Sequence, residues 1–332
     1  MSVSVSRVSS GREAELWAIE MASDSLTATL LNVGASLWKL TVRTGGGERS
    51  VCLHHRDVTS YWSNRPYFGC TVGPVANRIR DSHFELDGTV HVLEPNEGPH
   101  HLHGGPRGLG TRAWDFDVDR QAAAVTFATR HEAGDGGYPG NLDVAVTWRL
   151  GGNTLAFEWI AVADEATPIS LTTHPYWNLG TTDSVDGHAL RIDASHVVEV
   201  DEGKIPTGRL LPVSALGLDF LGGAMLGDTA QVRREVDHCF ALDQGGTVEL
   251  ASPSRDLVMT METDLPGLQV YTGDLLDGSA ASGGYGPRAG VCLEPQYFPN
   301  AVNEPSFECP ILSPGVPLKS RTVFSFTPTD QG

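Results

Sequence analysis

The stretch LDVAVTWRLGGNTLAFEW, residues 142–159, decides the fold class of this 332-residue chain. Apolar side chains occupy every second position from Leu142 to Leu150, and the alternation resumes at Leu155 after the turn residues GGNT. Because successive side chains of a β-strand point to opposite faces, this period of two predicts two strands, each with one buried face. Glycine and asparagine between two such runs favour a tight connection. The stretch therefore predicts an antiparallel β-hairpin.

Short alternating runs of the same kind occur on both sides of the hairpin. They lie at Ser25 to Leu31, Trp38 to Val42, Val125 to Thr129 and Val323 to Phe326, whereas Leu268 to Tyr271 is too short to assign from its pattern. No segment has the long amphipathic period of a helix. The chain has 38 glycines and 20 prolines, and this glycine content exceeds the usual ~7% and supplies many turns. We therefore expect an all-β sandwich or open sheet rather than an α/β fold.

The organisation of the chain indicates one unit. No change of composition or Pro/Ser-rich linker divides it, and no repeat of fixed period is present. We expect residues 1–332 to form a single domain, because a chain of this length can bury a sizeable core. The glycine-rich segment ASGGYGPRA, residues 281–289, is interpreted as a flexible surface connection. A phosphate-binding loop would continue into a helix with a lysine, and neither follows.

The charge balance argues against two classes of partner. With 23 basic and 41 acidic side chains the formal net charge is −18, which repels nucleic-acid phosphates and anionic lipid surfaces. The N-terminal sequence lacks the apolar stretch of a signal peptide, and no later run approaches the ~18 apolar residues of a membrane span. The five scattered cysteines form no CxxC pair and are expected to be reduced and mostly buried. We expect a cytoplasmic protein without nucleic-acid or membrane partners.

Polar side chains suited to chemistry concentrate in four segments. These are residues 68–105, LTTHPYWNLG at 171–180, VDHCF at 236–240 and CLEPQYFPNAVN at 292–303. Taken singly, each residue has an ordinary explanation. Arg78 could be a surface ion-pair partner, Asp237 beside His238 could be a local pair, and Glu294 could mark the water-facing end of a strand. Single positions therefore do not establish a function.

One pair of histidines suggests a metal site as an alternative. His101 and His103 would share one face of a strand, and two imidazoles there can ligate a metal, as in cupin-type enzymes. Such a site needs a carboxylate and a further histidine close by. The residues that follow contain a cation, Arg107, and no carboxylate. We therefore expect no metal, and a cupin-like metal enzyme is the less favoured alternative.

Eight short motifs, taken together, resemble one family, the aldose 1-epimerases or galactose mutarotases. In family order they are ANRI (76–79), LHGG (102–105), GYPG (137–140), LTTHPYWNL (171–179), IPTG (205–208), VDHCF (236–240), LQVYTGD (268–274) and LEPQYFPNAVN (293–303). The resemblance implies a large antiparallel β-sandwich of the galactose mutarotase type, with an open cleft that binds a monosaccharide. It also implies an isomerase of hexose metabolism.

The matching motifs also imply roles for individual residues. The resemblance makes Glu294 the general base and His174 the general acid, with His103 as a third catalytic residue. The family's sugar-binding positions fall on Asn77, Arg78, Asp237 and Gln269. His100 and His101 match no family role.

The chemistry of anomer exchange is consistent with these residue types. A proton must leave the C1 hydroxyl while another reaches the ring oxygen, so that the ring opens, rotates about the C1 to C2 bond and closes on the other face. A carboxylate such as Glu294 can accept the first proton, and a histidine such as His174 can donate the second. His103 and Arg78 can stabilise charge near the ring oxygen. One acid and one base suffice, so no cofactor is expected.

Five residues depart from the family pattern and bear on the preferred sugar. They are Pro74, Thr173, Pro175, Pro295 and Phe298, all expected to border the cleft. An aldohexose such as galactose or glucose is the default, while a pentose, a deoxysugar or a sugar phosphate stays open. Trp177 and Phe298 are interpreted as core side chains rather than as surfaces for a sugar ring.

A protein of another class could use the same fold. A non-catalytic carbohydrate-binding or sensing protein would keep the sugar-binding residues and could lose the acid or the base. Both Glu294 and His174 are present, which favours the enzyme. The oligomeric state, monomer or homodimer, is left open by the sequence.

Overall fold

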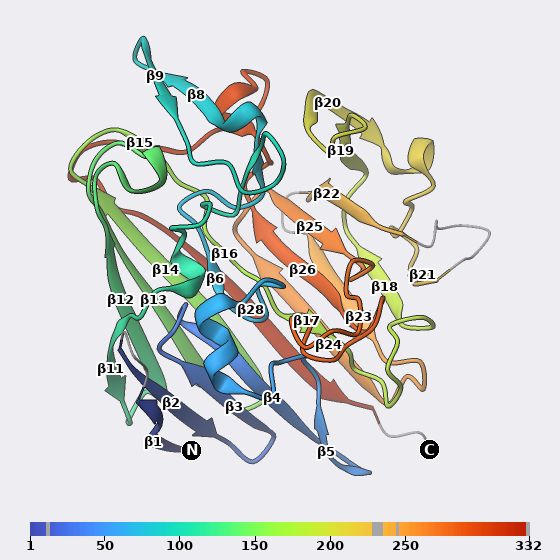
Figure 1. Cartoon of the computed structure of the whole chain (residues 1–332). Coiled ribbons are helices and arrows are strands. Elements are labelled where there is room, and N and C mark those ends of the chain that lie inside the picture. The colour runs from blue at the N-terminus through green and yellow to red at the C-terminus, as the bar shows by residue number, and fades with distance from the viewer. Residues whose placement is uncertain (11–13, 228–234, 244–245, 330–332) are drawn as a thin grey trace.

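Antiparallel strands make up most of the regular structure in the computed structural model (Figure 1). The structure describes residues 1–332 except 11–13, 228–234, 244–245 and 330–332. Within that part of the chain the helices are short 3-10 turns, namely η1 (Val58–Ser63), η2 (Arg80–Ser82), η3 (Leu109–Thr111), η4 (Asp135–Gly137), η5 (Val213–Leu216) and η6 (Ala301–Asn303). None of them has the length and apolar character that crossing a membrane requires. The all-β prediction is confirmed.

Three large sheets contain most of the strands. The five-stranded sheet has the order β1 (Ser2–Ser10), β2 (Glu15–Ala22), β3 (Leu26–Leu31), β4 (Ser36–Thr44) and β5 (Gly47–Ser50). The nine-stranded sheet has the order β11 (Asp115–Asp119), β12 (Ala124–His131), β13 (Leu142–Gly151), β14 (Thr154–Ala163), β28 (Leu318–Pro328), β24 (Leu257–Thr263), β23 (Thr247–Ala251), β18 (Ala189–Ile192) and β21 (Ala224–Met225). The six-stranded sheet has the order β17 (Tyr176–Trp177), β26 (Val291–Gln296), β25 (Gly267–Tyr271), β22 (Asp237–Ala241), β19 (His196–Val200) and β20 (Pro206–Pro212).

Four short ribbons complete the described strands. They pair β10 (His101–Leu102) with β7 (Arg78–Ile79), β15 (Thr167–Pro168) with β27 (Ile311–Leu312), β16 (Thr172–Thr173) with β6 (Thr71–Val72), and β8 (His83–Leu86) with β9 (Thr89–Val92). The β10–β7 and β16–β6 ribbons belong to the loops that connect the large sheets, and β16 contacts β26 of the six-stranded sheet. These loops carry several of the residues discussed below.

The predicted hairpin at residues 142–159 forms as β13 and β14. Leu150 lies opposite Leu155 across the turn, and Trp148 packs against Phe157 with ring centroids 4.9 Å apart. The other predicted runs correspond to β3, β4, β12 and β28, of which β3 begins one residue after the predicted start at Ser25. The stretch from Leu268, too short to assign from its sequence, belongs to β25 at the centre of the six-stranded sheet. Its residues are buried on both faces except at the end, which removes the alternation that would have revealed a strand.

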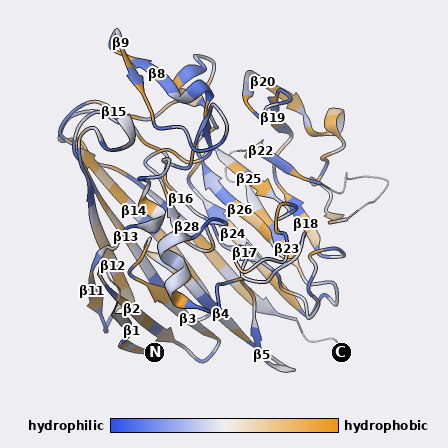
Figure 2. Ribbon diagram, viewed as in Figure 1, coloured by the Kyte–Doolittle hydropathy of each residue, from blue (hydrophilic) through white to orange (hydrophobic). Residues whose placement is uncertain are grey.

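The main core includes residues of the nine-stranded sheet and of both the six-stranded and the five-stranded sheets. Trp177 of β17 packs against Phe324 and Phe326 of β28, with ring centroids 5.1 and 5.9 Å apart. Apolar and polar residues alternate along many of the strands that enclose this core (Figure 2). Trp177 is fully buried, and Phe298 packs against Phe307 at 5.0 Å. Both aromatic side chains are therefore packing residues, as predicted.

Buried cysteines and histidines occupy several core positions. All five cysteines are free, and four of them are buried, as the sequence indicated. His188 is fully buried and neutral, because its Nδ1–H donates to the Val185 carbonyl at 3.0 Å while its Nε2 accepts from the Leu179 amide at 3.0 Å. Burial lowers the pKa of His188 to about 4 and that of His131 to about 4.

These histidines make the stability of the fold dependent on pH. Their folded pKa values lie below the ~6.5 of an unfolded histidine, so the unfolded chain binds more protons between pH 6.5 and 4. The contribution of these two histidines to stability is therefore fully present above pH 6.5 and is lost as the pH falls to about 4, by up to about 1.4 kcal/mol per pH unit for each histidine. We expect urea unfolding at pH 7.5, 6 and 5 to show this loss. His131→Phe should reduce the dependence of the unfolding free energy on pH. His196→Phe, at an exposed position, should leave that dependence unchanged. Equal pH dependence in the wild type and both variants would contradict the explanation.

Candidate active site

The six-stranded sheet presents polar side chains on one face and core side chains on the other. Gln269 of β25 lies opposite Glu294 of β26, and the Gln269 amide donates to the Asp237 carboxylate of β22 at 2.6 Å. The intervening residues Val270 and Leu293 are fully buried in the core. Since side chains alternate between faces, the same three strands build the core and the floor of a pocket.

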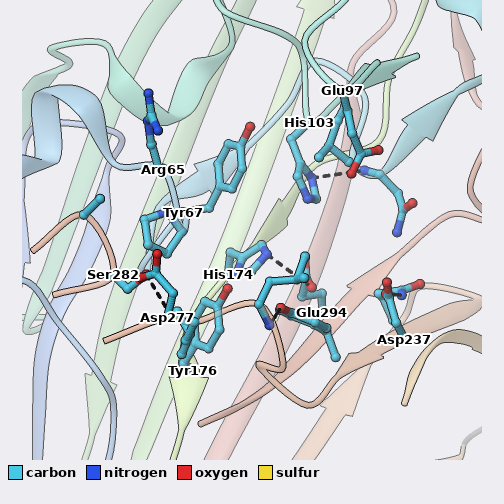
Figure 3. A pocket seen from close by; sticks show the side chains of 18 of the residues that line it. Arg65, Tyr67, Glu97, His103, His174, Tyr176, Asp237, Asp277, Ser282 and Glu294 are labelled. Carbon is cyan, nitrogen blue, oxygen red and sulfur yellow. Dashed lines mark hydrogen bonds and ion pairs between the residues drawn. The ribbon is translucent and has the colours of Figure 1, made fainter. Parts of the chain in front are cut away.

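A buried carboxyl and a buried imidazole meet on this floor. His174 follows β16, where its amide donates to the Cys70 carbonyl at 3.0 Å. Its Nε2 lies 3.5 Å from Oε1 of Glu294, and the two side chains are 5% and 2% exposed. The His174 ring is flanked by Tyr67 and Tyr176, with centroids 5.8 and 5.2 Å away. The pair is therefore fixed by packing as well as by its mutual contact (Figure 3).

Two hydrogen bonds hold His103 and Asn77 together. The His103 amide donates to the Asn77 carbonyl at 3.0 Å, and the Asn77 amide donates to Nδ1 of His103 at 3.2 Å. Because Nδ1 accepts, the proton of the neutral ring lies on Nε2. Both residues have positive φ angles, 56° and 64°, a strained conformation that clusters at functional sites. The result is a histidine oriented as a hydrogen-bond donor, with its ring centroid 5.4 Å from that of His174.

Each charged sugar-binding candidate has a partner of opposite charge. Glu97 accepts from Nε and Nη2 of Arg78 at 2.6 and 2.9 Å, and Nζ of Lys204 donates to Asp237 at 2.6 Å. The ion-pair explanation of Arg78 is thus correct, but the pair lies in the wall of the pocket. Glu97 and Lys204 were missed by sequence reasoning. They stand on turns 19 and 33 residues from their partners and belong to none of the eight motifs, although Glu97 lies within the segment 68–105.

All seven residues predicted from the sequence line one open pocket with a volume of about 310 Å³ (Figure 3). They are Glu294, His174, His103, Asn77, Arg78, Asp237 and Gln269. The remaining wall includes side chains that the sequence did not single out, among them Arg65, Tyr67, Glu97, Tyr176, Tyr271, Asp277 and Ser282. Hydrogen-bonding groups and aromatic rings together suit a small polar ligand.

Two expectations about the cleft are corrected. Of the five departures from the family pattern, none lines this pocket; Pro295, for example, follows Glu294 on β26 and so faces the other side of the sheet. The glycine-rich segment is also more than a surface connection. Its residues Ala281 and Ser282 line the pocket, and Arg288 is buried between Asp186 and Asp274. Those ion pairs anchor the segment against the site.

Burial dominates the electrostatics of the central pair. It raises the pKa of Glu294 well above its usual value, with the nearby Asp237 charge adding to the effect and Arg78 opposing it. Burial also lowers the pKa of His174 to about 4 and that of His103 well below its usual range. A perturbed carboxyl beside a perturbed imidazole in a pocket is the arrangement expected of an acid and base. The pocket thus favours forms in which these groups are uncharged.

The structure brings together a different set of possible metal ligands from the one that the sequence suggested. His101 does not join His103, because its Nδ1–H donates to the Glu94 carbonyl at 2.6 Å and its Nε2 faces the Tyr138 hydroxyl at 3.0 Å. Among the described residues, the three that bring possible ligand atoms within 4.8 Å of one another are His103, His174 and Glu294. These are the proposed acid–base residues, so the expectation of no metal stays a prediction.

The site and the fold together define a class of protein. A carboxyl and an imidazole in contact on the floor of a polar pocket, on a β-sandwich, are typical of an acid–base enzyme for a small polar substrate. The sequence model of the family described as Aldose 1-epimerase matches residues 18–325. The chain is 36% identical over 322 residues to the galactose mutarotase of Sus scrofa, with 93% of each chain covered. It is 32% identical over 319 residues to the aldose 1-epimerase of Escherichia coli, with 91% and 92% covered.

Solved structures agree with this result. The chain superimposes on an aldose epimerase homologue from C. elegans with a TM-score of 0.87 and 32% identity, covering 94% of this chain and 99% of that one. A galactose 1-epimerase from Lactobacillus acidophilus has the same fold, with a TM-score of 0.88, 24% identity and 99% and 100% covered. The chain therefore belongs to the aldose 1-epimerase family and is an isomerase. The predicted reaction class is confirmed, and neither the sugar sensor nor the cupin-like enzyme is favoured.

Proposed function

We propose that this chain interconverts the α and β anomers of a free aldohexose such as galactose or glucose, with Glu294 as general base and His174 as general acid. The observation that carries the proposal is the 3.5 Å contact between their side chains on the floor of the pocket. The names of the mammalian relatives, galactose mutarotases, support galactose as the first sugar to test.

The reaction requires one proton on the central pair. With that proton on His174, Glu294 is a carboxylate that can accept the proton of the C1 hydroxyl while His174 protonates the ring oxygen. The ring opens, and the pair now consists of a protonated Glu294 and a neutral His174. These are the forms that burial favours for each residue. Ring closure on the other face of the aldehyde returns the protons by the reverse path.

The neighbouring side chains supply binding and charge stabilisation. Nε2–H of His103 and the guanidinium of Arg78 are donors for the ring-oxygen region, where charge develops. Asn77, Asp237 and Gln269 hold the other hydroxyls and so orient the anomeric carbon against the pair. Glu97, through its two bonds to Arg78, fixes the plane of that guanidinium.

The pH dependence of the reaction follows from the single proton. A second proton must charge the buried His174, whose pKa is lowered to about 4, and loss of the only proton must ionise Glu294, whose pKa is raised. We expect kcat/KM to be constant across the range between these two steps, to fall below pH about 4 and to fall again on the alkaline side. Exchange NMR between pH 3.5 and 9, corrected for the spontaneous rate, measures this profile. An acid limb centred near 6.5, the value of a free histidine, would contradict the assignment of His174 as a buried neutral group.

The proposed function is tested by anomer exchange. Freshly dissolved α-galactose and α-glucose are followed by polarimetry and NMR with and without the purified protein, and a panel of pentoses, deoxysugars and sugar phosphates follows. We expect acceleration over the spontaneous rate with at least one aldohexose. Absence of acceleration with every aldose of the panel would refute the proposal. Metal analysis of the active protein tests whether the three potential ligands hold an ion.

A further inference from the structure

Lys204 contacts the sugar site through Asp237 without lining the pocket itself. Its Nζ lies 2.6 Å from Oδ2 of Asp237, and Nε2 of Gln269 lies 2.6 Å from Oδ1 of the same carboxylate. Each oxygen of Asp237 therefore has its own donor from the protein. The Asp237 side chain is 13% exposed and that of Lys204 is 35% exposed, so the ion pair is partly shielded from water.

A tight turn presents Lys204 to the site. The Lys204 amide donates to the Asp201 carbonyl at 3.0 Å, and the Asp201 amide donates to the Ile205 carbonyl at 2.9 Å. Oδ1 of Asp201 closes the turn by accepting from the amides of Gly203 and Ile205 at 2.9 and 3.0 Å. Lys204 itself has a positive φ of 61°, a conformation that non-glycine residues adopt at a cost of about 1 kcal/mol or more. Hydrogen bonds within the turn thus fix the backbone of Lys204, from which the side chain extends to Asp237.

We infer that Lys204 is a positioning residue for the sugar site, acting on the substrate through Asp237. The inference rests on the proposed function of the pocket. A carboxylate offers about four lone-pair directions, and the two donors occupy one on each oxygen. The remaining directions are then fixed in space and can accept hydroxyl protons of a bound sugar. Without Lys204 the carboxylate has one donor and can rotate about its last bond, so binding must also restrict that rotation.

The charges near the pocket explain why the partner of Asp237 is a cation. Asp237 is a negative charge close enough to Glu294 to raise the pKa of that carboxyl. The ammonium of Lys204, paired with Asp237, offsets the repulsion between the two carboxylates when Glu294 is ionised, which would otherwise favour rotation of Asp237 away from the pocket. Lys204 therefore serves ground-state binding of the sugar rather than proton transfer.

Lys204→Met is the direct test, with Lys319→Met as the matched control. Lys319 lies on β28 at an exposed position of another sheet. We expect Lys204→Met to raise KM for galactose about tenfold, as contacting residues commonly couple by this amount, while kcat changes less than about twofold. Lys204→Arg, which keeps the charge and the donors, should recover most of the loss. Lys319→Met should match the wild type, and all three variants should keep its melting temperature within a few degrees.

A double-mutant cycle separates a positioning role from a general one. In the Asp237→Asn background, Lys204→Met should cause no further rise in KM, because its effect passes through the carboxylate. An additive rise, or a fall in kcat with KM unchanged, would overturn the inference. Calorimetric titration with galactose gives the dissociation constants of the same proteins without turnover. A wild type that binds galactose without exchanging its anomers would refute the proposed function, whereas equal dissociation constants in wild type and Lys204→Met would refute only the role of Lys204.

Discussion

Replacing Glu294 by glutamine is expected to lower kcat by about 10²- to 10⁴-fold, the contribution that a positioned acid or base makes to proton transfer. The amide keeps the size of the side chain but cannot accept the proton of the C1 hydroxyl. Glu294 is buried against His174, and its Oε2 has no hydrogen-bond partner in the part of the chain that the structure describes, so the substitution removes no structural hydrogen bond from that atom. Polarimetry with α-galactose measures the loss of rate, and thermal melting reports whether the fold survives.

The matched control for this variant is Glu158→Gln on the nine-stranded sheet. Glu158 lies on β14 and pairs with Arg149 and Arg321 outside the pocket. Its substitution should leave kcat and KM at the wild-type values, because the partly exposed pairs that it breaks contact none of the residues that line the pocket. If Glu294→Gln retained the full rate, another group would have to be the base, and the assignment of Glu294 would fail even though the family membership stands.

Trp177→Ala is expected to lower the free energy of unfolding by about 3–5 kcal/mol, the range for removal of a buried aromatic side chain. Trp177 is fully buried and contacts Phe324 and Phe326 across the two sheets. Alanine would leave a cavity there that the two rigid sheets cannot close. Urea unfolding monitored by circular dichroism measures the change.

A second substitution at this position provides the control. The indole Nε1 of Trp177 is buried without a hydrogen-bond partner in the described structure, and Phe removes that unsatisfied donor while keeping an aromatic ring. Trp177→Phe should therefore cost clearly less than Trp177→Ala. Equal losses for the two variants would show that packing against Phe324 and Phe326 does not explain the stability.

The fold was predictable where one face of a strand is polar. The β13–β14 hairpin shows a clean alternation because its outer face is partly exposed to water. β25 gave no such signal, because Leu268, Gln269 and Val270 are all buried, one face in the core and the other beneath the pocket. A strand buried on both sides shows no contrast between its faces. The strand that is hardest to predict from the sequence is therefore one that builds the site.

The site was predictable only through the ordered motifs. Glu294 and His174 are separated by 120 positions in sequence, and no local pattern links them. Glu97 and Lys204 escaped because an isolated charge on a turn is ordinarily a solvated surface group. The anchoring of the segment at 281–289 by Arg288 was missed for the same reason, since its acidic partners Asp186 and Asp274 lie in other loops. Contacts between distant turns are set by the tertiary fold, which a single sequence does not display.

The alternation of faces in the six-stranded sheet limits how this enzyme can evolve. Insertion of one residue into β26 would exchange Glu294 with Leu293 between pocket and core, so that catalysis and folding would fail together. The turns at the rim do not contribute to both the pocket and the core in this way. Residues such as Glu97 and Lys204 can therefore be substituted without moving a strand. Substitutions in the rim turns alone can therefore change the substrate preference. Changes in the strands that would abolish the reaction would also disrupt the fold, so selection for folding also maintains the reaction.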